Sequence, residues 1–392
     1  MARRYAADVA VIGAGICGTS VAAVLAGAGV RVTIYEREAV AAGASGRNSG
    51  VVQRPLDPLL VPLYEATLAV YRELAAEAPE AGFALPDEPA GLLLAALRGD
   101  GLPALAARLA ASAPDLEPVV LDEAALREIE PALAAGVAAI RLPIGYPVVP
   151  SAPTYAMATL AERRGATIRL GRSVRVWSRG DRAVGVDLDG VVEPADAVVV
   201  AAGPWSSGVV DITGTWRPIR PSWGVVVETL LASPPRHVIE EAGMDAVIAH
   251  DADDAAGIAM RGRVHNHGFS LVPAGAICAV GSTFLDAEPE LDPWRDRILE
   301  RGVAFVPRLF DAPIRETRAC ARPVAADGRP LIGALPWLDG LYICSGHGPW
   351  GISTGPGSAA LVADIIIGRG PPIAPAFDPG RFGAPDQVAS IR

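Results

Sequence analysis

A glycine-rich stretch near the C-terminus, CSGHGPWGISTGPGS, carries the residue types that most directly suggest chemistry. Its histidine, His347, has two interpretations: a general base, or part of a loop whose backbone N–H groups bind a ligand. The glycines on both sides favour the second, because a residue without a side chain lets a ligand approach the backbone closely. The apolar segment that follows has a helical pattern, so its N-terminus would present the N–H groups of Gly351 to Thr354. The loop is therefore predicted to stabilise negative charge on a bound group, with His347 assisting by position or charge or simply packing.

Three glycines near the N-terminus have the spacing that a bound dinucleotide requires. Gly13, Gly15 and Gly18 come directly after an apolar, β-branched segment (8–12) and before an alanine-rich helical pattern. In such a turn the first glycine permits a tight bend, the second lets N–H groups approach a pyrophosphate, and the third lets the helix pack on the strand. A second strand-like segment ends in Glu36, 18 residues past Gly18, where a carboxylate would bind ribose hydroxyls. Strand, helix, strand and acid together predict a dinucleotide fold.

The segment after Glu36 favours FAD over NAD. Residues 43–52, GASGRNSGVV, form a second small-residue loop with one cation and several hydroxyl and amide groups. An NAD domain needs no second loop directly after its acidic residue, whereas the ribityl chain and ring of FAD extend further along a protein. Two alternatives stay open from this segment alone: a surface turn rich in glycine and serine, and an NAD-binding protein without flavin. The candidate residues in this loop are Ser45, Gly46, Arg47, Asn48 and Ser49.

Composition and charge argue against several other classes of protein. The chain has 392 residues, of which 51% are hydrophobic and 20% charged, as in a globular protein long enough for two substructures. Its formal net charge is −10 and it has no basic stripe, so nucleic acid is not expected as a partner. The four cysteines, Cys17, Cys278, Cys320 and Cys344, contain no C-x-x-C pair. This argues against a disulfide framework or zinc site and favours a reducing, cytoplasmic compartment.

The N-terminus has features of a targeting segment but is interpreted differently. Two arginines precede about twenty mostly apolar residues, a pattern that a signal peptide or membrane helix would share. The patterned glycines within that run, and the strand-like VRVTIYERE after it, favour the dinucleotide fold instead. No other stretch is long and apolar enough to cross a bilayer, so no membrane span is expected.

Six motifs spread along the chain extend this interpretation. In order they are VAVIGAGICG, YERE, GASGRNSG, VVVAAGPWS (198–206), ARPVAADGRPLIG (321–333) and GLYICSGHGPWGISTGPGSA (340–359). Together they resemble the FAD-dependent amine and amino-acid oxidoreductases of the D-amino-acid oxidase superfamily, which includes glycine and sarcosine oxidases. The resemblance covers most of the chain, and its motifs are specific for the superfamily rather than for one substrate.

The resemblance implies an α/β fold with a discontinuous, Rossmann-like FAD-binding domain and a substrate domain built on a mostly antiparallel sheet. The FAD-binding domain would comprise residues 1–80, 146–215 and 316–392, and the substrate domain residues 81–145 and 216–315. The sequence pattern agrees, because 165–206 predicts several short strands and 269–284 predicts antiparallel strands. Residues 104–135 predict a helix with Pro131 near its end.

The resemblance also implies which residues hold FAD. In the family, Val174 would lie against the adenine, while Ala201, Ala202 and Gly203 would close the dinucleotide domain through backbone contacts. The implied set is Gly13, Gly15, Gly18, Glu36, Arg37, Ser45, Gly46, Arg47, Asn48, Ser49, Val174, Ala202, Gly203, Gly346, Gly348, Gly351, Ile352, Ser353 and Thr354. FAD is expected to be non-covalent. A covalent link through Cys320 is the alternative, because monomeric sarcosine oxidases attach FAD through a cysteine at this place.

The implied reaction is oxidation of an amino acid or secondary amine, in which hydride passes from Cα to flavin N5 and the imine then hydrolyses. A cation must hold the substrate carboxylate, and Arg322 is the candidate because guanidinium binds carboxylates in bidentate geometry. Arg318 is the weaker candidate. His347 and Trp350 complete the expected catalytic set. Pro349 and Trp350 stand where glycine-oxidising relatives often have more polar residues, so the resemblance does not assign glycine or sarcosine as the substrate.

Other assignments stay open from the sequence. His265 and His267 would share one face of a strand, but no third ligand accompanies them, so no metal site is expected. Trp223 either lines the substrate pocket or packs in the core. The alternatives in function are oxidation of a 2-hydroxy acid on FAD and a flavoprotein subunit of a hetero-oligomeric dehydrogenase. The electron acceptor, oxygen or another, and the homo- or hetero-oligomeric state are not decided by the residues.

Overall fold

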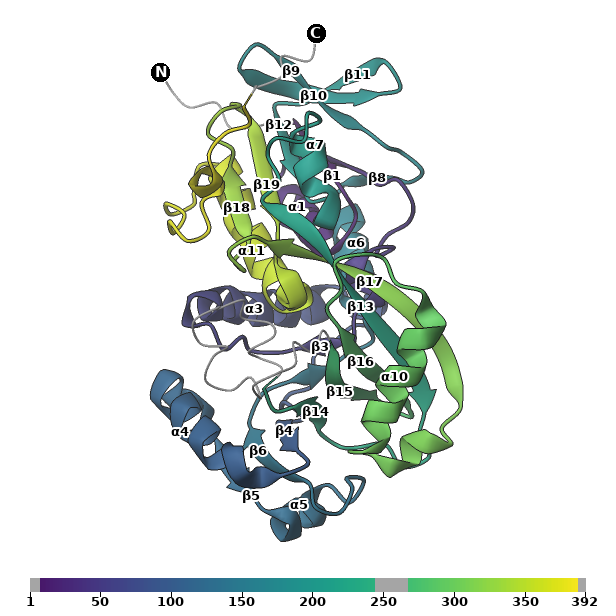
Figure 1. Ribbon diagram of the computed structural model, residues 1–392. Coiled ribbons are helices and arrows are strands. Elements are labelled where there is room, and N and C mark those ends of the chain that lie inside the picture. Colours follow the sequence, from purple (N-terminus) through teal and green to yellow (C-terminus); the bar gives the residue numbers. More distant parts are fainter. Residues whose placement is uncertain (1–7, 244–266, 387–392) are drawn as a thin grey trace.

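The computed structural model describes residues 8–243 and 267–386, which fold around two β-sheets (Figure 1). The first sheet has six strands in the order β18-β19-β12-β1-β2-β8. Its strands are β1 (Asp8–Ile12), β2 (Arg31–Tyr35), β8 (Thr167–Arg169), β12 (Ala197–Val200), β18 (Leu331–Ala334) and β19 (Leu341–Ser345). Neighbouring strands run parallel except β18 and β19, which are antiparallel. The predicted Rossmann-like sheet is confirmed.

Alternation along β1 explains why both faces of this sheet are covered. Val9 and Val11 point into one core, whereas Ala10 and Ile12 point into the opposite one. Helices fill the first core: α1 (Ile16–Gly27), α3 (Val61–Glu77), α6 (Ala152–Arg163) and α11 (Gly351–Ile366). A three-stranded sheet covers the second core: β9 (Arg175–Arg179), β10 (Arg182–Leu188) and β11 (Val191–Pro194). The carboxyl end of β1 is thereby buried between two packed layers.

Helix α11 contains a proline, and the surrounding structure compensates for it. Pro356 has no N–H to donate to the carbonyl of Ile352, four residues earlier. The buried hydroxyl of Tyr71 donates to that carbonyl instead, at 2.7 Å. One residue further, Gly357 donates its N–H to Thr67 Oγ1 at 2.9 Å, and a Cβ on this glycine would lie 2.2 Å from a backbone oxygen of α3. The Gly-Pro-Gly sequence thus lets α11 pack tightly on α3 and fixes where its first turn points.

The second sheet has eight strands in the order β17-β13-β16-β15-β14-β4-β6-β5. They are β4 (Leu92–Ala96), β5 (Val119–Leu121), β6 (Ala138–Leu142), β13 (Ile219–Leu230), β14 (Val238–Glu241), β15 (His267–Ala274), β16 (Ile277–Thr283) and β17 (Ile314–Ala325). All neighbours are antiparallel except β14 and β4, so the predicted mostly antiparallel sheet is confirmed. Helix α10 (Leu291–Val303) packs on one face and α4 (Leu102–Ser112) on the other (Figure 1).

Short elements connect the two sheets. They are α2 (Ala44–Arg47), α7 (Ser206–Val210), β3 (Val51–Val52) and β7 (Tyr146–Pro147), whereas α5 (Glu123–Ile129) lies between β5 and β6 of the larger sheet. Strands β3 and β7 form an antiparallel ribbon, which joins the segment after the second glycine-rich loop to the segment that enters α6. None of the helices in the two described ranges is both long and apolar enough to cross a membrane.

One prediction about the elements differs from the structure, and one expected domain boundary lies within a strand. Residues 104–135 do not form one helix, because α4 ends before Pro114, whose ring starts a short 3₁₀ turn, and β5 and α5 follow. The expected boundary at residue 316 falls inside β17, which pairs with β13 along its length in the larger sheet. The short strands predicted over 165–206 and 269–284 are present, with turns near Gly180 and Gly190.

Candidate active site

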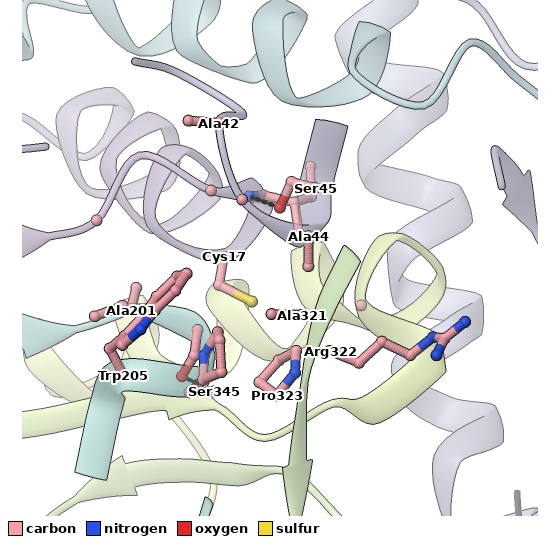
Figure 2. Close-up of a pocket in the computed structure, with 18 of the residues that line it drawn as sticks. Cys17, Ala42, Ala44, Ser45, Ala201, Trp205, Ala321, Arg322, Pro323 and Ser345 are labelled. Carbon is pink, nitrogen blue, oxygen red and sulfur yellow. Dashed lines mark hydrogen bonds between the residues drawn. The ribbon is translucent and has the colours of Figure 1, made fainter. Parts of the chain in front are cut away.

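A cavity of about 450 Å³ is lined by residues from both sheets. Its wall includes the carboxyl ends of β1, β2, β12 and β19, the first turn of α1, helix α2 and the middle of β17. Open α/β sheets bind ligands at the carboxyl ends of their strands. Figure 2 shows Trp205 and Ser345 toward one side of this cavity and the Arg322 side chain extending toward the other. The cavity therefore joins the dinucleotide turn to the larger sheet.

The three N-terminal glycines have separate structural reasons. Gly13 has φ +110°, which favours glycine, and a Cβ there would lie 2.5 Å from the carbonyl oxygen of Ala201. A Cβ on Gly18 would lie 1.9 Å from the carbonyl oxygen of Gly13, so α1 packs on the turn only because residue 18 has no side chain. Gly15 lines the cavity, and a Cβ added there would lie 3.1 Å from Ser45 Oγ. The turn thus directs the first N–H groups of α1 toward the cavity.

Glu36 stands at the end of β2 as predicted, and its carboxylate is fixed by the backbone. One oxygen accepts from the N–H of Ala14 at 2.8 Å and the other from the N–H of Glu38 at 2.8 Å. Each oxygen keeps a further lone pair for a ligand hydroxyl. Next to it, the Arg37 guanidinium lies 3.9 Å from the centroid of the Trp205 ring, and both residues line the cavity with Val174. This end of the cavity combines an acceptor with flat, polarisable surface.

The second glycine-rich loop is held in shape by its own polar groups. Ser45 Oγ accepts from the N–H of Ile16 at 2.9 Å and so ties α2 to the first turn of α1. The Asn48 amide donates to the carbonyls of Ala44 and Ser45, while its oxygen accepts from the N–H of Gly50 at 2.7 Å. Because these side chains satisfy backbone groups around the short helix α2, they fix the shape of the loop along the cavity wall.

The C-terminal loop presents open backbone to the cavity. A Cβ added to Gly348 or Gly351 would meet no atom within 4 Å, and the same holds for Gly203. All three line the cavity. Helix α11 begins at Gly351, and no side chain caps its N-terminus, so its first N–H groups have no intrahelical acceptor. A flat group could therefore lie directly against the backbone here, with the positive end of a helix beside it.

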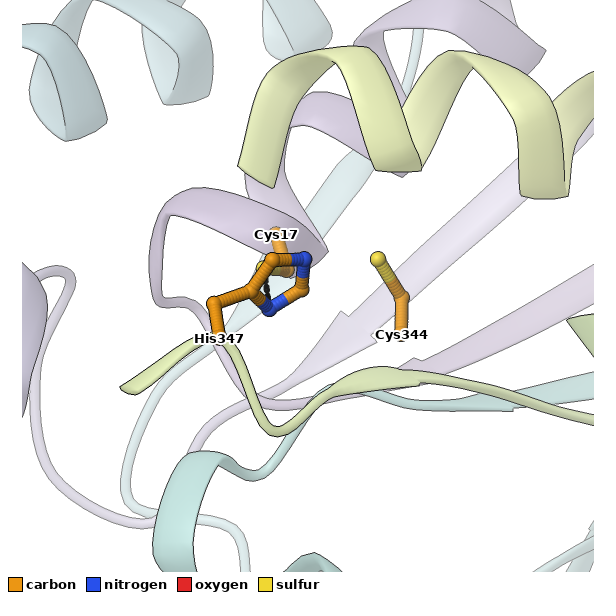
Figure 3. Close-up of side chains that lie close together, drawn as sticks. All are labelled: Cys17, Cys344 and His347. Carbon is orange, nitrogen blue, oxygen red and sulfur yellow. Dashed lines mark hydrogen bonds between the residues drawn. The ribbon is translucent and has the colours of Figure 1, made fainter. Parts of the chain in front are cut away.

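His347 also lines the cavity, but both of its ring nitrogens have partners within the protein, and Figure 3 shows the contact with Cys17. Its side chain is 2% exposed. Nε2 lies 3.0 Å from Ser358 Oγ, and Nδ1 lies 3.7 Å from Cys17 Sγ. A general base needs a lone pair directed at the substrate proton. These two contacts tie the loop that carries His347 to α1 and α11.

Arg322 and Arg318, the two candidates for the carboxylate clamp, lie in different environments. Arg318 is 7% exposed and pairs with the carboxylate of Glu228 at 2.6 Å. It also donates to the carbonyls of Arg47 at 3.1 Å and Asn48 at 3.0 Å. Its charge and donors are therefore committed to joining β17, β13 and the second glycine-rich loop.

Arg322 lines the cavity and is positioned by neutral groups. Its guanidinium donates to the carbonyl of Thr283 at 2.8 Å and to Ser282 Oγ at 2.6 Å, and lies 4.6 Å from the centroid of the Phe284 ring. Within the described ranges, no carboxylate lies within 4.0 Å of it. Burial lowers the pKa of this guanidinium, although arginine keeps its charge in proteins. A Cβ on Gly224 of the neighbouring strand would lie 2.3 Å from Nη2, so the guanidinium occupies space left by that glycine.

Most of the predicted site residues meet at this cavity, and some do not. Those that line it are Gly13, Gly15, Glu36, Arg37, Ser45, Arg47, Asn48, Val174, Ala202, Gly203, Arg322, His347, Gly348, Gly351 and Ile352. Those outside its lining are Gly18, Gly46, Ser49, Gly346, Trp350, Ser353 and Thr354.

The residues outside the lining have packing or bonding roles instead. A Cβ on Gly46 would lie 2.3 Å from a backbone oxygen, so this glycine allows α2 to fold back on the preceding turn. Ser353 Oγ accepts from the N–H of Gln53 at 2.9 Å, and Thr354 Oγ1 donates to the carbonyl of Trp350. Trp350 itself packs against the helical core of the six-stranded sheet. Its indole ring therefore does not narrow the cavity.

Several lining residues were not predicted from the sequence as site residues. All four lie within motifs that carry the resemblance, but no spacing rule relates these residues to one another. They are Cys17, Trp205, Cys344 and Ser345. Trp223 lines the cavity, which decides between its two interpretations. Of the histidine pair, His265 lies outside the described residues, and His267 packs edge-on against Trp294 of α10.

The fold and cavity define a class of protein in which a parallel sheet binds a dinucleotide beside a larger antiparallel sheet. Residues 8–365 match the family described as FAD dependent oxidoreductase. This chain belongs to that family and is an FAD-dependent oxidoreductase.

Known relatives agree with this assignment over nearly the whole chain. A glycine oxidase of Pseudomonas aeruginosa is 29% identical over 381 residues, which cover 94% of this chain and 97% of the relative. The crystal structure of glycine oxidase from Bacillus cereus superposes with a TM-score of 0.78 at 26% identity, covering 94% of this chain and 96% of that one. The crystal structure of iminodiacetate oxidase from a Chelativorans species superposes with a TM-score of 0.79 at 26% identity, covering 95% of this chain and 98% of that one.

The residues present fit FAD. The cavity runs from the Glu36 carboxylate, past the first turn of α1, to the open backbone at Gly348 and Gly351. Glu36 offers an acceptor for ribose hydroxyls, and the first turn of α1 offers N–H groups for a pyrophosphate. The open backbone at the two glycines offers a flat surface for a ring. Cys320 lines the cavity and is 1% exposed, and burial raises the pKa of its thiol. A thiol with a raised pKa is a poor nucleophile, which agrees with non-covalent FAD.

Proposed function

We propose that this protein oxidises a small α-amino acid or N-substituted amino acid on FAD, with Arg322 holding the substrate carboxylate. The family supplies the reaction class, which is FAD-dependent oxidation of amino acids or amines. When bound, FAD supplies the acceptor for the hydride that leaves the carbon next to nitrogen. The work left to the protein is to bind the cofactor, orient the substrate and stabilise charge.

The observation that carries the proposal is that Arg322, on the cavity wall, is hydrogen-bonded only to neutral groups in the part of the chain that the structure describes. It is a cation on the cavity wall that donates only to a carbonyl and a hydroxyl among the described residues. A partly buried charge without an ionic partner is costly unless a ligand supplies one. A substrate carboxylate would do so in bidentate geometry. Arg318 is a poor candidate for this role, because its guanidinium already pairs with the carboxylate of Glu228 at 2.6 Å.

The remaining residues act on binding and charge. Glu36 would accept from ribose hydroxyls, and the first turn of α1 would donate N–H groups to the phosphates. The first turn of α11 would stabilise negative charge at the far end of the cavity. His347 positions this loop through Ser358 rather than taking a proton from the substrate.

The proposal includes the electron acceptor and the cellular compartment of the enzyme. The relatives named oxidases favour oxygen as the acceptor of electrons. The four cysteines are unbonded to one another, which supports a reducing, cytoplasmic location.

Anaerobic reduction of the FAD-loaded protein tests the proposal. Loss of the flavin absorption would be followed with glycine, sarcosine, iminodiacetate, D- and L-amino acids and 2-hydroxy acids. We expect reduction by at least one amino acid, and a loss of at least about 30-fold in the apparent rate constant when Arg322→Ala removes the buried partner of its carboxylate. Arg315→Ala, on the exposed part of the same strand, is the matched control and should behave as the unaltered protein.

Three outcomes would contradict the proposal. Reduction by 2-hydroxy acids alone would assign the enzyme to the other substrate class. Reduction by none of the panel would remove the catalytic assignment and favour a subunit that needs a partner. Equal loss of rate in Arg315→Ala and Arg322→Ala would show that Arg322 has no special place in substrate binding.

A further inference from the structure

Three reactive side chains meet on the cavity wall, and the proposed amine oxidation uses none of them as a reacting group (Figure 3). Cys17 comes from the first turn of α1, Cys344 from the end of β19, and His347 from the loop that follows. One sulfur or nitrogen atom of each lies within 4.8 Å of the others. Segments more than 300 residues apart in sequence thus place two thiols and an imidazole together.

The hydrogen bonds around His347 determine which nitrogen faces Cys17 as an acceptor. Ser358 Oγ donates its proton to the carbonyl of Thr354 at 2.9 Å. Its contact with Nε2 of His347 at 3.0 Å is therefore one in which the ring N–H donates to the hydroxyl. A neutral ring protonated at Nε2 has its lone pair on Nδ1, which lies 3.7 Å from Cys17 Sγ. Nδ1 is placed to accept the proton of the Cys17 thiol.

The two thiols are chemically unequal. The pKa of Cys17 is held well below its usual range by a hydrogen bond from Cys344 and by His347, and the first turn of a helix favours the same anion. The pKa of Cys344 is raised by that same hydrogen bond and by burial. Cys17 is also partly exposed on the cavity wall, whereas Cys344 is 1% exposed. One sulfur is an accessible nucleophile and the other is a sheltered thiol beside it.

We propose that Cys17 is a hydroperoxide-reactive thiol and that Cys344 resolves its oxidised form, which joins α1 to β19 through a disulfide. In the first step the Cys17 proton passes to Nδ1 of His347, the thiolate attacks a peroxide oxygen and the O–O bond breaks. The leaving oxygen takes that proton back, so the products are a sulfenic acid and water or an alcohol. In the second, the Cys344 sulfur attacks that of Cys17, the S–O bond breaks, and the hydroxide leaves with the Cys344 proton as water. Two thiols lose two electrons, and one hydroperoxide gains them.

The bond would change the first turn of α1. The sulfur atoms, now within 4.8 Å, must approach to about 2.05 Å, which moves Cys17 Sγ toward β19. The first turn of α1 belongs to the dinucleotide site, so oxidation would restrain the part of the chain that receives the phosphates. The inference does not require the proposed function, because any hydroperoxide serves as oxidant; an oxidase would produce one in the same cavity.

The experiment treats the FAD-free and FAD-loaded proteins with hydrogen peroxide and maps the cysteines by alkylation and peptide mass spectrometry. We expect a linked Cys17–Cys344 peptide and the loss of two thiols per chain, reversed by dithiothreitol. In Cys344→Ser, Cys17 should stop at a sulfenic acid that dimedone traps. Cys278→Ser is the matched control and should still form the link, because Cys278 is buried in the larger sheet and burial raises its pKa to about 12.

Two further readouts separate a specific link from general oxidation. Saturating FAD should slow the loss of Cys17 thiol, because Cys17 lines the cavity. The linked protein should melt at a higher temperature than the reduced protein, since the bond closes a loop of most of the chain. This rise should be absent in Cys344→Ser.

Other results would overturn the proposal. One is equal dimedone labelling of Cys17 in the unaltered protein and in Cys344→Ser, which would mean that Cys344 does not resolve it. Another is reaction of Cys278 as fast as Cys17. A third is one equivalent of zinc retained through purification and lost in Cys17→Ser, which would make the three side chains a metal site. An unchanged melting temperature in linked protein would refute the restraint of α1.

Discussion

The close contact between Gly224 and the Arg322 guanidinium offers a sharp test of how the substrate is held. Gly224 on β13 has no side chain, and an added Cβ would lie 2.3 Å from Nη2 and 2.6 Å from Cζ of Arg322. Gly224→Ala therefore forces the guanidinium to move by about 1 Å to reach ordinary contact distance. The backbone of Gly224 is not in the left-handed region, so alanine itself is tolerated there. The substitution acts on the position of one charge.

The displacement should weaken the two bonds that fix the guanidinium, to Ser282 Oγ and the carbonyl of Thr283. A hydrogen bond to a charged group contributes about 1.5–3 kcal/mol, which corresponds to about 10- to 150-fold in an equilibrium or rate constant. We expect kcat/KM for the amino-acid substrate to fall by that factor in Gly224→Ala. The effect on unfolding should be small, because the end of a long side chain can shift.

The assay is steady-state kinetics with the best substrate of the panel, together with FAD affinity and the urea midpoint. The control is Gly208→Ala in α7, where a Cβ meets no atom within 4 Å and the backbone also suits alanine. An unchanged kcat/KM in Gly224→Ala would refute the reasoning, since a 1 Å shift of a true carboxylate clamp cannot be silent. A parallel loss of FAD affinity would also refute it, because the change would then not be confined to the substrate end.

Three more predictions concern cofactor binding, folding and pH. Glu36→Ala should weaken FAD binding by about 10- to 100-fold in a fluorescence titration, because it removes an acceptor for ribose and two for backbone N–H groups; unchanged affinity would contradict the assignment. Tyr71→Phe should lower the free energy of unfolding by about 1–3 kcal/mol in urea, because it leaves the α11 carbonyl beside the proline without a donor; a change below the error of the fit would contradict this. Burial alone would raise the pKa of Asp211, but hydrogen bonds from Thr213, Trp216 and Thr215 outweigh it and lower the value to about 2. Because the folded pKa is depressed, this stabilisation is present above about pH 4 and is lost as pH falls toward 2, so Asp211→Asn should cost about 2 kcal/mol at pH 7 and much less near pH 2; an equal cost at both pH values would argue against it.

Local sequence was sufficient for the dinucleotide turn and its cofactor. The order of strand, glycines, helix and Glu36 is set by neighbouring residues, since a turn with positive φ and an acid at a strand end depend on short-range geometry. The same holds for the antiparallel strands of 269–284 and for the apolar pattern of α11. The prediction of a single helix over 104–135 was wrong. Composition favoured a helix there, but Pro114 ends the first helix and the following residues form the edge strand β5 of the larger sheet.

Only the tertiary structure decided which side chains do what at the site. Arg318 and Arg322 are four residues apart on β17, yet their surroundings differ. Arg318 lies beside Glu228 and the loop after α2, whereas Arg322 lies beside the end of β16 and lines the cavity. Trp350 is half-buried against the helical core of the six-stranded sheet instead of lining the cavity. Cys17 and Cys344 met because α1 and β19 pack side by side, a contact between ends of the chain that no local pattern encodes. Sequence therefore determined the cofactor and its turn, while the packing of distant segments determined the surroundings of Arg322, the position of His347 and the thiol pair.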